Sequence, residues 1–273
     1  MDSMRRCLLL LLLTLLPFST IGKPQRIVSV GLCTDQLLLM LAEREQIASV
    51  SHWVLDERMS YMRDAVGDIP INRATIEEII RLKPDLVVAS EFVARDTMRL
   101  LQLLGYPVYR FLVPTSVEET YGFIEEFGRQ TGNESRAAEM IANMQARLSE
   151  IRGRYATRPP KTFIIFGPNG YTIGANTLEH DIFAHAGYHN LAAEMGIEGF
   201  QSVSLEQLVV ANPDVLQVDL ELSRQHSLAT SHLTHPVIEK IIMQRELLDI
   251  PLNLRICAGP MIIEAVEMMA ARR

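Results

Sequence analysis

Residues 75–88 read TIEEIIRLKPDLVV, and residues 204–218 read SLEQLVVANPDVLQV. In both stretches a hydroxyl residue stands two positions before a Glu, and a Pro-Asp pair begins seven positions after that Glu. Each copy predicts a short capped helix, a proline stop and a buried strand. A repeat of this kind predicts a chain built as two similar halves.

Strand and helix patterns alternate around both copies of the repeat. Strands are expected at Arg26–Val30, Ile47–Val50, Val108–Leu112, Thr162–Phe166 and Val215–Asp219. Helices are expected at Asp35–Ala42, Asp96–Leu104, Thr177–Ala186, Pro236–Gln244 and Met261–Ala270. Apolar strands that alternate with helices predict an α/β fold, with two Rossmann-like lobes whose parallel sheets are covered by helices.

A long helix is expected between the halves, at Glu134–Tyr155. Apolar residues recur there at helical spacing, and the stretch has no Gly or Pro before Gly153. About 22 residues at 1.5 Å each would make a rod of roughly 33 Å. We therefore expect lobes at residues 24–132 and 158–273, joined by a linking helix at 133–157. The alternative is a helix that packs along one large domain.

The N-terminal segment has the composition of an export signal. Arg5 and Arg6 precede an almost unbroken run of leucines from Leu8 to Leu16, and Pro17 ends that run. The run is too short to span a bilayer, so residues 1–22 predict a cleaved signal peptide and a periplasmic protein. The alternative is an uncleaved anchor. Cys7 precedes the leucines and would leave with the signal.

Composition excludes some classes of partner. The chain is 48% hydrophobic and 22% charged, with 26 basic and 33 acidic residues and a net charge of −7. Nucleic acids and anionic membrane surfaces require clustered Lys and Arg, which an acidic chain of this kind does not favour.

The two Glu-(six residues)-Pro-Asp units, the long middle helix and the signal segment together resemble one family. They are similar to the periplasmic substrate-binding proteins of ABC importers for vitamin B12, ferric siderophores and heme, over residues 26–270. The resemblance implies a protein that binds a metal chelate, a ferric siderophore or cobalamin, in a cleft between two lobes. It also implies a monomer without enzymatic activity or cofactor, whose partners are the chelate and an ABC permease in the inner membrane.

The resemblance also implies permease docking by one acidic residue on each lobe, here Glu77 and Glu206. Thr75 with Glu78, and Ser204 with Gln207, match the capping-box pattern. Glu77 and Glu206 would then point outward, where carboxylates can pair with permease arginines. The local alternative is that each acid only favours the dipole of its helix, by roughly 0.3–1 kcal/mol.

Ligand contacts are expected at the carboxyl ends of the strands, where α/β sheets leave a crevice. The matching loops are Gly31–Asp35, Ser51–Asp56, Gly167–Gly174, Gly199–Ser202 and Ile256–Pro260. The candidate ligand-binding residues in them are Cys33, Thr34, His52, Trp53, Tyr171, Phe200 and Cys257. Aromatic rings in loops suit a flat, partly apolar chelate. The alternative for each ring is a place in a small satellite core.

The two cysteines beyond the signal segment have three interpretations. Cys33 and Cys257 could be buried free thiols, a disulfide across the cleft, or soft contacts to a metal-bearing ligand. We expect both thiols to lie at the rim of one cleft, to react with a thiol label in the free protein and to be protected by the chelate.

Two other functions compete with chelate binding. A zinc- or manganese-binding protein would need His and carboxylate ligands converging on the cleft, but the seven histidines favour surface or cap positions. Among them, His226, His232 and His235 cluster after the second Pro-Asp strand. A thiol-dependent enzyme could use Cys33 with His52, although no catalytic motif accompanies them. The cleft loops also lack an arginine cluster, which favours a weakly charged chelate.

Overall fold

The computed structural model describes residues 22–218 and 236–273. The expectations that fall on residues 1–21 and 219–235, including most of the signal segment and His226, His232 and His235, lie outside the described residues. Among the described residues, no helix is both long and apolar enough to cross a membrane.

The first lobe is built on a five-stranded parallel sheet. Its strands run in the order β3-β2-β1-β4-β5. Their bounds are β1 Ile27–Ser29, β2 Ile47–Ser51, β3 Ile71–Asn72, β4 Leu86–Ser90 and β5 Val108–Phe111. The helices of this half are α2 Leu32–Leu41, α3 Ile76–Arg81, α4 Arg95–Leu103 and α5 Val117–Thr131.

The second lobe is built on a four-stranded parallel sheet. Its strands run in the order β11-β10-β6-β8. Their bounds are β6 Lys161–Ile165, β8 Tyr188–Asn190, β10 Val215–Gln217 and β11 Glu246–Leu248. Two further strands, β7 Tyr171–Ile173 and β9 Phe200–Ser202, pair antiparallel. The helices of this half are α7 Leu178–His185, α8 Leu191–Glu194, α9 Leu205–Ala211, α11 Pro236–Gln244 and α12 Met261–Arg272.

The aspartate of each repeated Pro-Asp pair makes equivalent hydrogen bonds within its own half of the chain. The Asp85 carboxylate accepts hydrogen bonds from the backbone N–H groups of Gln25 and Arg26, at 2.7 and 2.9 Å, where β1 begins. The Asp214 carboxylate accepts from the backbone N–H and the hydroxyl of Thr162, both at 2.8 Å, at the start of β6. Each aspartate therefore aligns the strand that follows it with the first strand of its own sheet.

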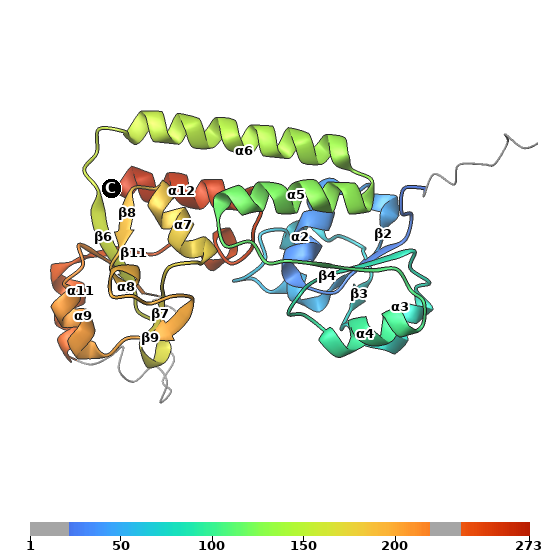
Figure 1. Ribbon diagram of the computed structural model, residues 1–273, viewed down its shortest axis with the longest axis horizontal. Coiled ribbons are helices and arrows are strands. Elements are labelled where there is room, and N and C mark those ends of the chain that lie inside the picture. Colours follow the sequence, from blue (N-terminus) through green and yellow to red (C-terminus); the bar gives the residue numbers. More distant parts are fainter. Residues whose placement is uncertain (1–21, 219–235) are drawn as a thin grey trace, which may run out of the picture.

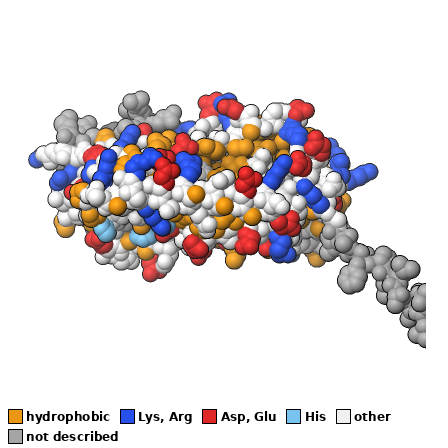
Figure 2. Space-filling model, turned by 90° about the horizontal axis from the view of Figure 1, so that it is seen from above, with side chains coloured by type: hydrophobic (Ala, Val, Ile, Leu, Met, Phe, Trp, Pro, Cys, Tyr) orange, Lys and Arg blue, Asp and Glu red, His pale blue; other side chains and the backbone are white. Residues whose placement is uncertain are grey.

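Helix α6, Glu134–Tyr155, joins the two lobes. It lies along the top of Figure 1, above α5 in the first half and α12 in the second. Its buried residues are Ala137, Met144, Leu148 and Ile151, which recur at helical spacing. Arg147 and Arg154 of α6 both pair with Glu267 of α12. Figure 2 shows the molecule from above relative to Figure 1. Acidic and basic side chains are interspersed on this face, so charges of neither sign dominate it.

The secondary structure departs from the sequence-based expectations at several places. Helix α2 begins at Leu32, so Cys33 and Thr34 lie in its first turn rather than in a loop, because the Gly31 carbonyl already accepts from the Asp35 N–H at 2.8 Å. Tyr171 and Phe200 lie in the antiparallel strands β7 and β9 instead of loops. Helix α5 was not expected, although Ser116 caps it by accepting from the Glu119 N–H at 3.0 Å.

Candidate functional site

A cavity of about 600 Å³ lies between the two lobes. Ser90 at the end of β4 borders it from the first lobe, and Ile165 and Gln217 at the ends of β6 and β10 border it from the second. The carboxyl ends of parallel strands are where α/β sheets leave a binding crevice. We call this cavity the cleft.

Apolar side chains face the cleft from both lobes. Phe92 and Leu112 are 62% and 76% exposed on the first lobe, and Phe200 is 64% exposed on the second. Tyr171 and Phe200 stack with ring centroids 6.1 Å apart and planes 11° apart. Exposed apolar surface concentrated in a concave site marks a binding site, because a ligand that covers it removes the surface from water.

One buried ion pair forms part of the cleft wall. The Arg255 guanidinium contacts the Glu179 carboxylate in the first turn of α7, and Arg255 Nε donates to the Ile250 carbonyl at 3.2 Å. Burial raises the pKa of Glu179, while the Arg255 charge opposes that rise. Breaking a buried ion pair leaves an uncompensated charge, so this pair stabilises the packing of α7 against the loop before α12.

Gln217 is a functional candidate that sequence reasoning missed. It lies at the carboxyl end of β10, beside Ile165 of β6, and lines the cleft with only 1% of its surface exposed. Among residues 22–218 and 236–273, neither its Oε1 nor its Nε2 has a hydrogen-bond partner. The only available signal was a polar residue at the end of the apolar strand of the second repeat.

Three of the seven candidate ligand-binding residues line the cleft, namely Cys33, Tyr171 and Phe200. Thr34 is buried, and its hydroxyl donates to the Gly31 carbonyl at 2.9 Å, so it supports the start of α2. The rings of His52 and Trp53 contact each other in the short 3-10 helix His52–Leu55, with centroids 4.6 Å apart and planes tilted by 36°, and neither residue lines the cleft. Ligand contact by those two residues stays a prediction.

The cysteines form a disulfide. The bond joins Cys33 in the first turn of α2 to Cys257 before α12, with Cα atoms 5.2 Å apart. The expectation of two label-reactive thiols is therefore wrong, because both sulfurs are bonded to each other. Cys257 is 1% exposed, so only the Cys33 end of the bridge faces the cleft.

The two proposed docking acids lie in corresponding places on the two lobes. Glu77 and Glu206 are both exposed, in the first turns of α3 and α9. Both helices lie away from α6 (Figure 1). Ser204 and Gln207 form the expected capping box at α9.

The capping box expected at α3 is absent. The Thr75 side chain makes no capping bond to the helix, and the Glu78 carboxylate accepts from the Arg73 N–H at 2.7 Å. Glu77 takes no part in these hydrogen bonds, just as it would take none in a complete capping box.

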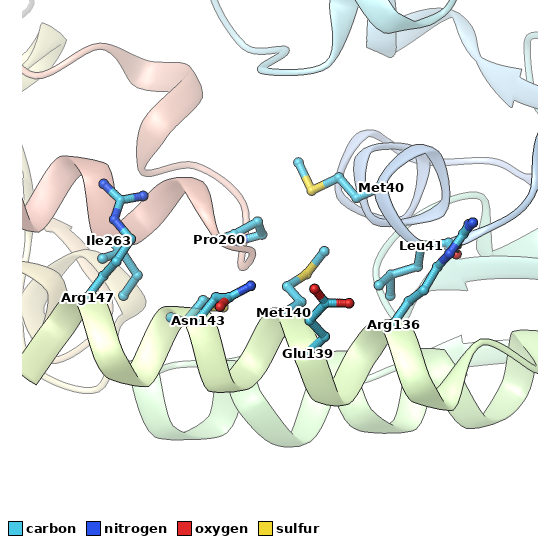
Figure 3. A pocket seen from close by; sticks show the side chains of 10 residues that line it. Met40, Leu41, Arg136, Glu139, Met140, Asn143, Arg147, Pro260 and Ile263 are labelled. Carbon is cyan, nitrogen blue, oxygen red and sulfur yellow. Dashed lines mark hydrogen bonds between the residues drawn. The ribbon is translucent and has the colours of Figure 1, made fainter.

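A second cavity lies on the other side of the junction between the lobes. It measures about 380 Å³ and runs between α6, α2 and the start of α12. Figure 3 shows Met40 of α2, Met140 of α6 and Pro260 before α12 facing into it. No strand end borders it, so the cleft remains the candidate site. Within 22–218 and 236–273, no three His, Cys, Asp or Glu side chains are placed to hold a metal ion.

Comparison with known proteins assigns the chain to a family. The family model described as "Periplasmic binding protein" matches residues 27–247, and the chain belongs to that family. It is 27% identical over 214 residues to a cobalamin-binding protein of Halobacterium salinarum, covering 77% of this chain and 58% of that protein. The chain therefore spans little more than half the length of that relative.

Solved structures agree on the fold. A periplasmic heme-binding protein from Roseiflexus sp. RS-1 superposes with a TM-score of 0.73 at 22% identity, covering 90% of this chain and 97% of that one. The periplasmic vitamin B12-binding protein of Vibrio cholerae gives a TM-score of 0.69 at 19% identity, covering 91% and 96%. At these identities the likeness concerns the two-lobe fold.

Proposed function

We propose that this protein captures a metal chelate, a ferric siderophore or cobalamin, in the cleft and delivers it to an ABC permease in the inner membrane. The observation that carries the proposal is the pair of apolar walls, Phe92 and Leu112 facing Tyr171 and Phe200 across strand ends. A flat or rounded chelate inserted there covers apolar surface on both lobes at once. Residues 1–22 act as the export signal, and the protein works as a monomer in the periplasm without catalysing a reaction.

Permease docking uses Glu77 and Glu206. Both carboxylates are exposed on helices that lie away from α6, so one flat partner can reach both lobes without entering the cleft. Carboxylates accept bidentate hydrogen bonds from arginine, which gives such a contact both strength and orientation.

The direct test is calorimetric titration of the purified protein with cyanocobalamin, hemin and the ferric hydroxamate ferrichrome. We expect saturable binding of at least one of the three with one site per chain. A Phe200→Ala variant should weaken that binding without loss of folding, because the ring is mostly exposed. Absence of binding to all three chelates, by a protein that unfolds cooperatively, would reject the proposal.

A further inference from the structure

Gln217 lines the cleft, and its buried side-chain amide has no hydrogen-bond partner among the described residues. Its strand β10 is central in the second sheet, paired with β6 on one side and β11 on the other. Its backbone carbonyl takes part in the sheet, because it accepts from the Phe166 N–H at 3.0 Å. Within the part of the chain that the structure describes, neither polar atom of the side chain has a hydrogen-bond partner.

This arrangement is costly in the empty protein. A buried amide has two N–H donors and one carbonyl acceptor, and each unmade hydrogen bond carries a desolvation penalty. Buried polar side chains normally have partners, so an exception inside a binding cavity indicates a group that the ligand completes. Gln217 has both kinds of atom available, and the ligand must therefore supply both an acceptor and a donor.

We propose that Gln217 is a specificity-determining residue that selects chelates bearing a carboxamide. A carboxamide pairs with another in a complementary way, because each donates one N–H and accepts one. A carboxylate only accepts, and would leave the Gln217 carbonyl oxygen buried without a donor. The oxygens of a metal-bound hydroxamate also only accept. This inference rests on the proposed function, and it names the chemical class of ligand that the cleft prefers.

The charge of the cleft agrees with a neutral ligand group. Arg255 is the one Lys, Arg or His among the described residues that line the cleft, and Glu179 already holds its guanidinium. A ligand carboxylate would therefore meet no unpaired cation among those residues, whereas a neutral carboxamide needs none.

The test combines two readouts on Gln217→Met, which keeps the length of the side chain and removes its polar atoms. Cyanocobalamin is the carboxamide-bearing probe and hemin is the carboxylate-bearing probe. We expect the affinity of the variant for cyanocobalamin to fall by about 10-fold or more. We expect no loss of hemin affinity. The ligand-free variant should melt at the same or a higher temperature than the wild type, because an unsatisfied buried amide has been removed.

Gln217→Leu is the second variant, and the same pattern is expected from it. Unchanged cyanocobalamin affinity in folded variants would overturn the inference about Gln217 and leave the proposed function standing. A fall of several degrees in the melting temperature of the ligand-free variants would also overturn it, because it would show that Gln217 has a structural role. Wild-type protein that binds hemin and not cyanocobalamin would overturn the carboxamide preference while leaving chelate capture standing. Wild-type protein that binds neither probe nor ferrichrome would overturn both proposals.

Discussion

Cys33 and Cys257 are bonded to each other across the two lobes, with their Cα atoms 5.2 Å apart although 224 positions separate them in the sequence. The bond ties the first turn of α2 to the loop before α12. A disulfide keeps its Cα atoms within about 7 Å. The lobes therefore cannot part at this point, and any opening of the cleft must turn about the bridge and α6.

Removing the bridge should lower the free energy of unfolding. A Cys33→Ser/Cys257→Ser variant loses a crosslink that closes most of the chain, and we expect a loss of roughly 2–5 kcal/mol. Denaturant unfolding of the two proteins, both without residues 1–22, measures the difference. The matched control is thiol titration of the unfolded wild type without reductant, where we expect no free thiol. Two reactive thiols per chain would contradict the bridge.

Phe200 should contribute more to chelate affinity than Trp53. Phe200→Ala removes a ring that lines the cleft, and we expect at least a ~10-fold loss of affinity for whichever chelate binds. Trp53→Ala is the matched control, because Trp53 is an exposed aromatic residue of the first lobe that does not line the cleft. Calorimetric titration compares the two variants. Equal losses from both would show that the binding surface extends to the short 3-10 helix.

Substitution of the proposed docking residues Glu77 and Glu206 should impair transport without weakening chelate binding. Glu77→Ala and Glu206→Ala should leave chelate affinity unchanged and reduce uptake through the cognate permease, since both carboxylates lie outside the cleft. Substitution by Lys should reduce uptake further, because like charges would face the permease arginines. Uptake of radiolabelled chelate in cells and titration of the purified variants give the two readouts. A parallel loss of affinity and uptake would assign these residues to the ligand site.

Asp35 should make stability depend on pH in the acid range. Burial raises the pKa of Asp35 to about 6, although Ser51 donates hydrogen bonds to its carboxylate. The folded protein thus binds this proton more tightly than the unfolded chain, whose reference pKa is 3.8. The stability that protonation supplies is complete below about pH 4 and is lost as the pH rises through 6, by roughly 3 kcal/mol.

An Asp35→Asn variant should lack this contribution to the pH profile. Urea unfolding at pH 4, 5, 6 and 7 would show the stability of the wild type falling relative to the variant as the pH rises. Parallel profiles for the two proteins would mean that the Asp35 carboxyl ionises in the folded protein as it does in the unfolded chain.

Local patterns in the sequence determined the elements and their order. The spacing of apolar residues in 134–155 predicted α6 with the bounds that the structure shows, because one buried face of a helix repeats every 3.6 residues. The two Pro-Asp repeats likewise predicted paired helix–strand units, because capping residues and prolines act on their near neighbours. The predictions of where α2 begins and how α3 is capped were wrong. At both places the backbone N–H groups have hydrogen-bond partners that differ from the predicted ones, and the sequence allows either arrangement.

Only the tertiary structure decided the content of the cleft. Cys33 and Cys257 each had three interpretations in sequence, and their bond depends on a meeting of two lobes that no local pattern encodes. The same holds for Gln217, because a glutamine at a strand end is ordinary until the surrounding elements bury it and leave its amide without a partner. Burial and pairing are properties of contacts between distant segments, whereas helix and strand periodicity belongs to the segment itself.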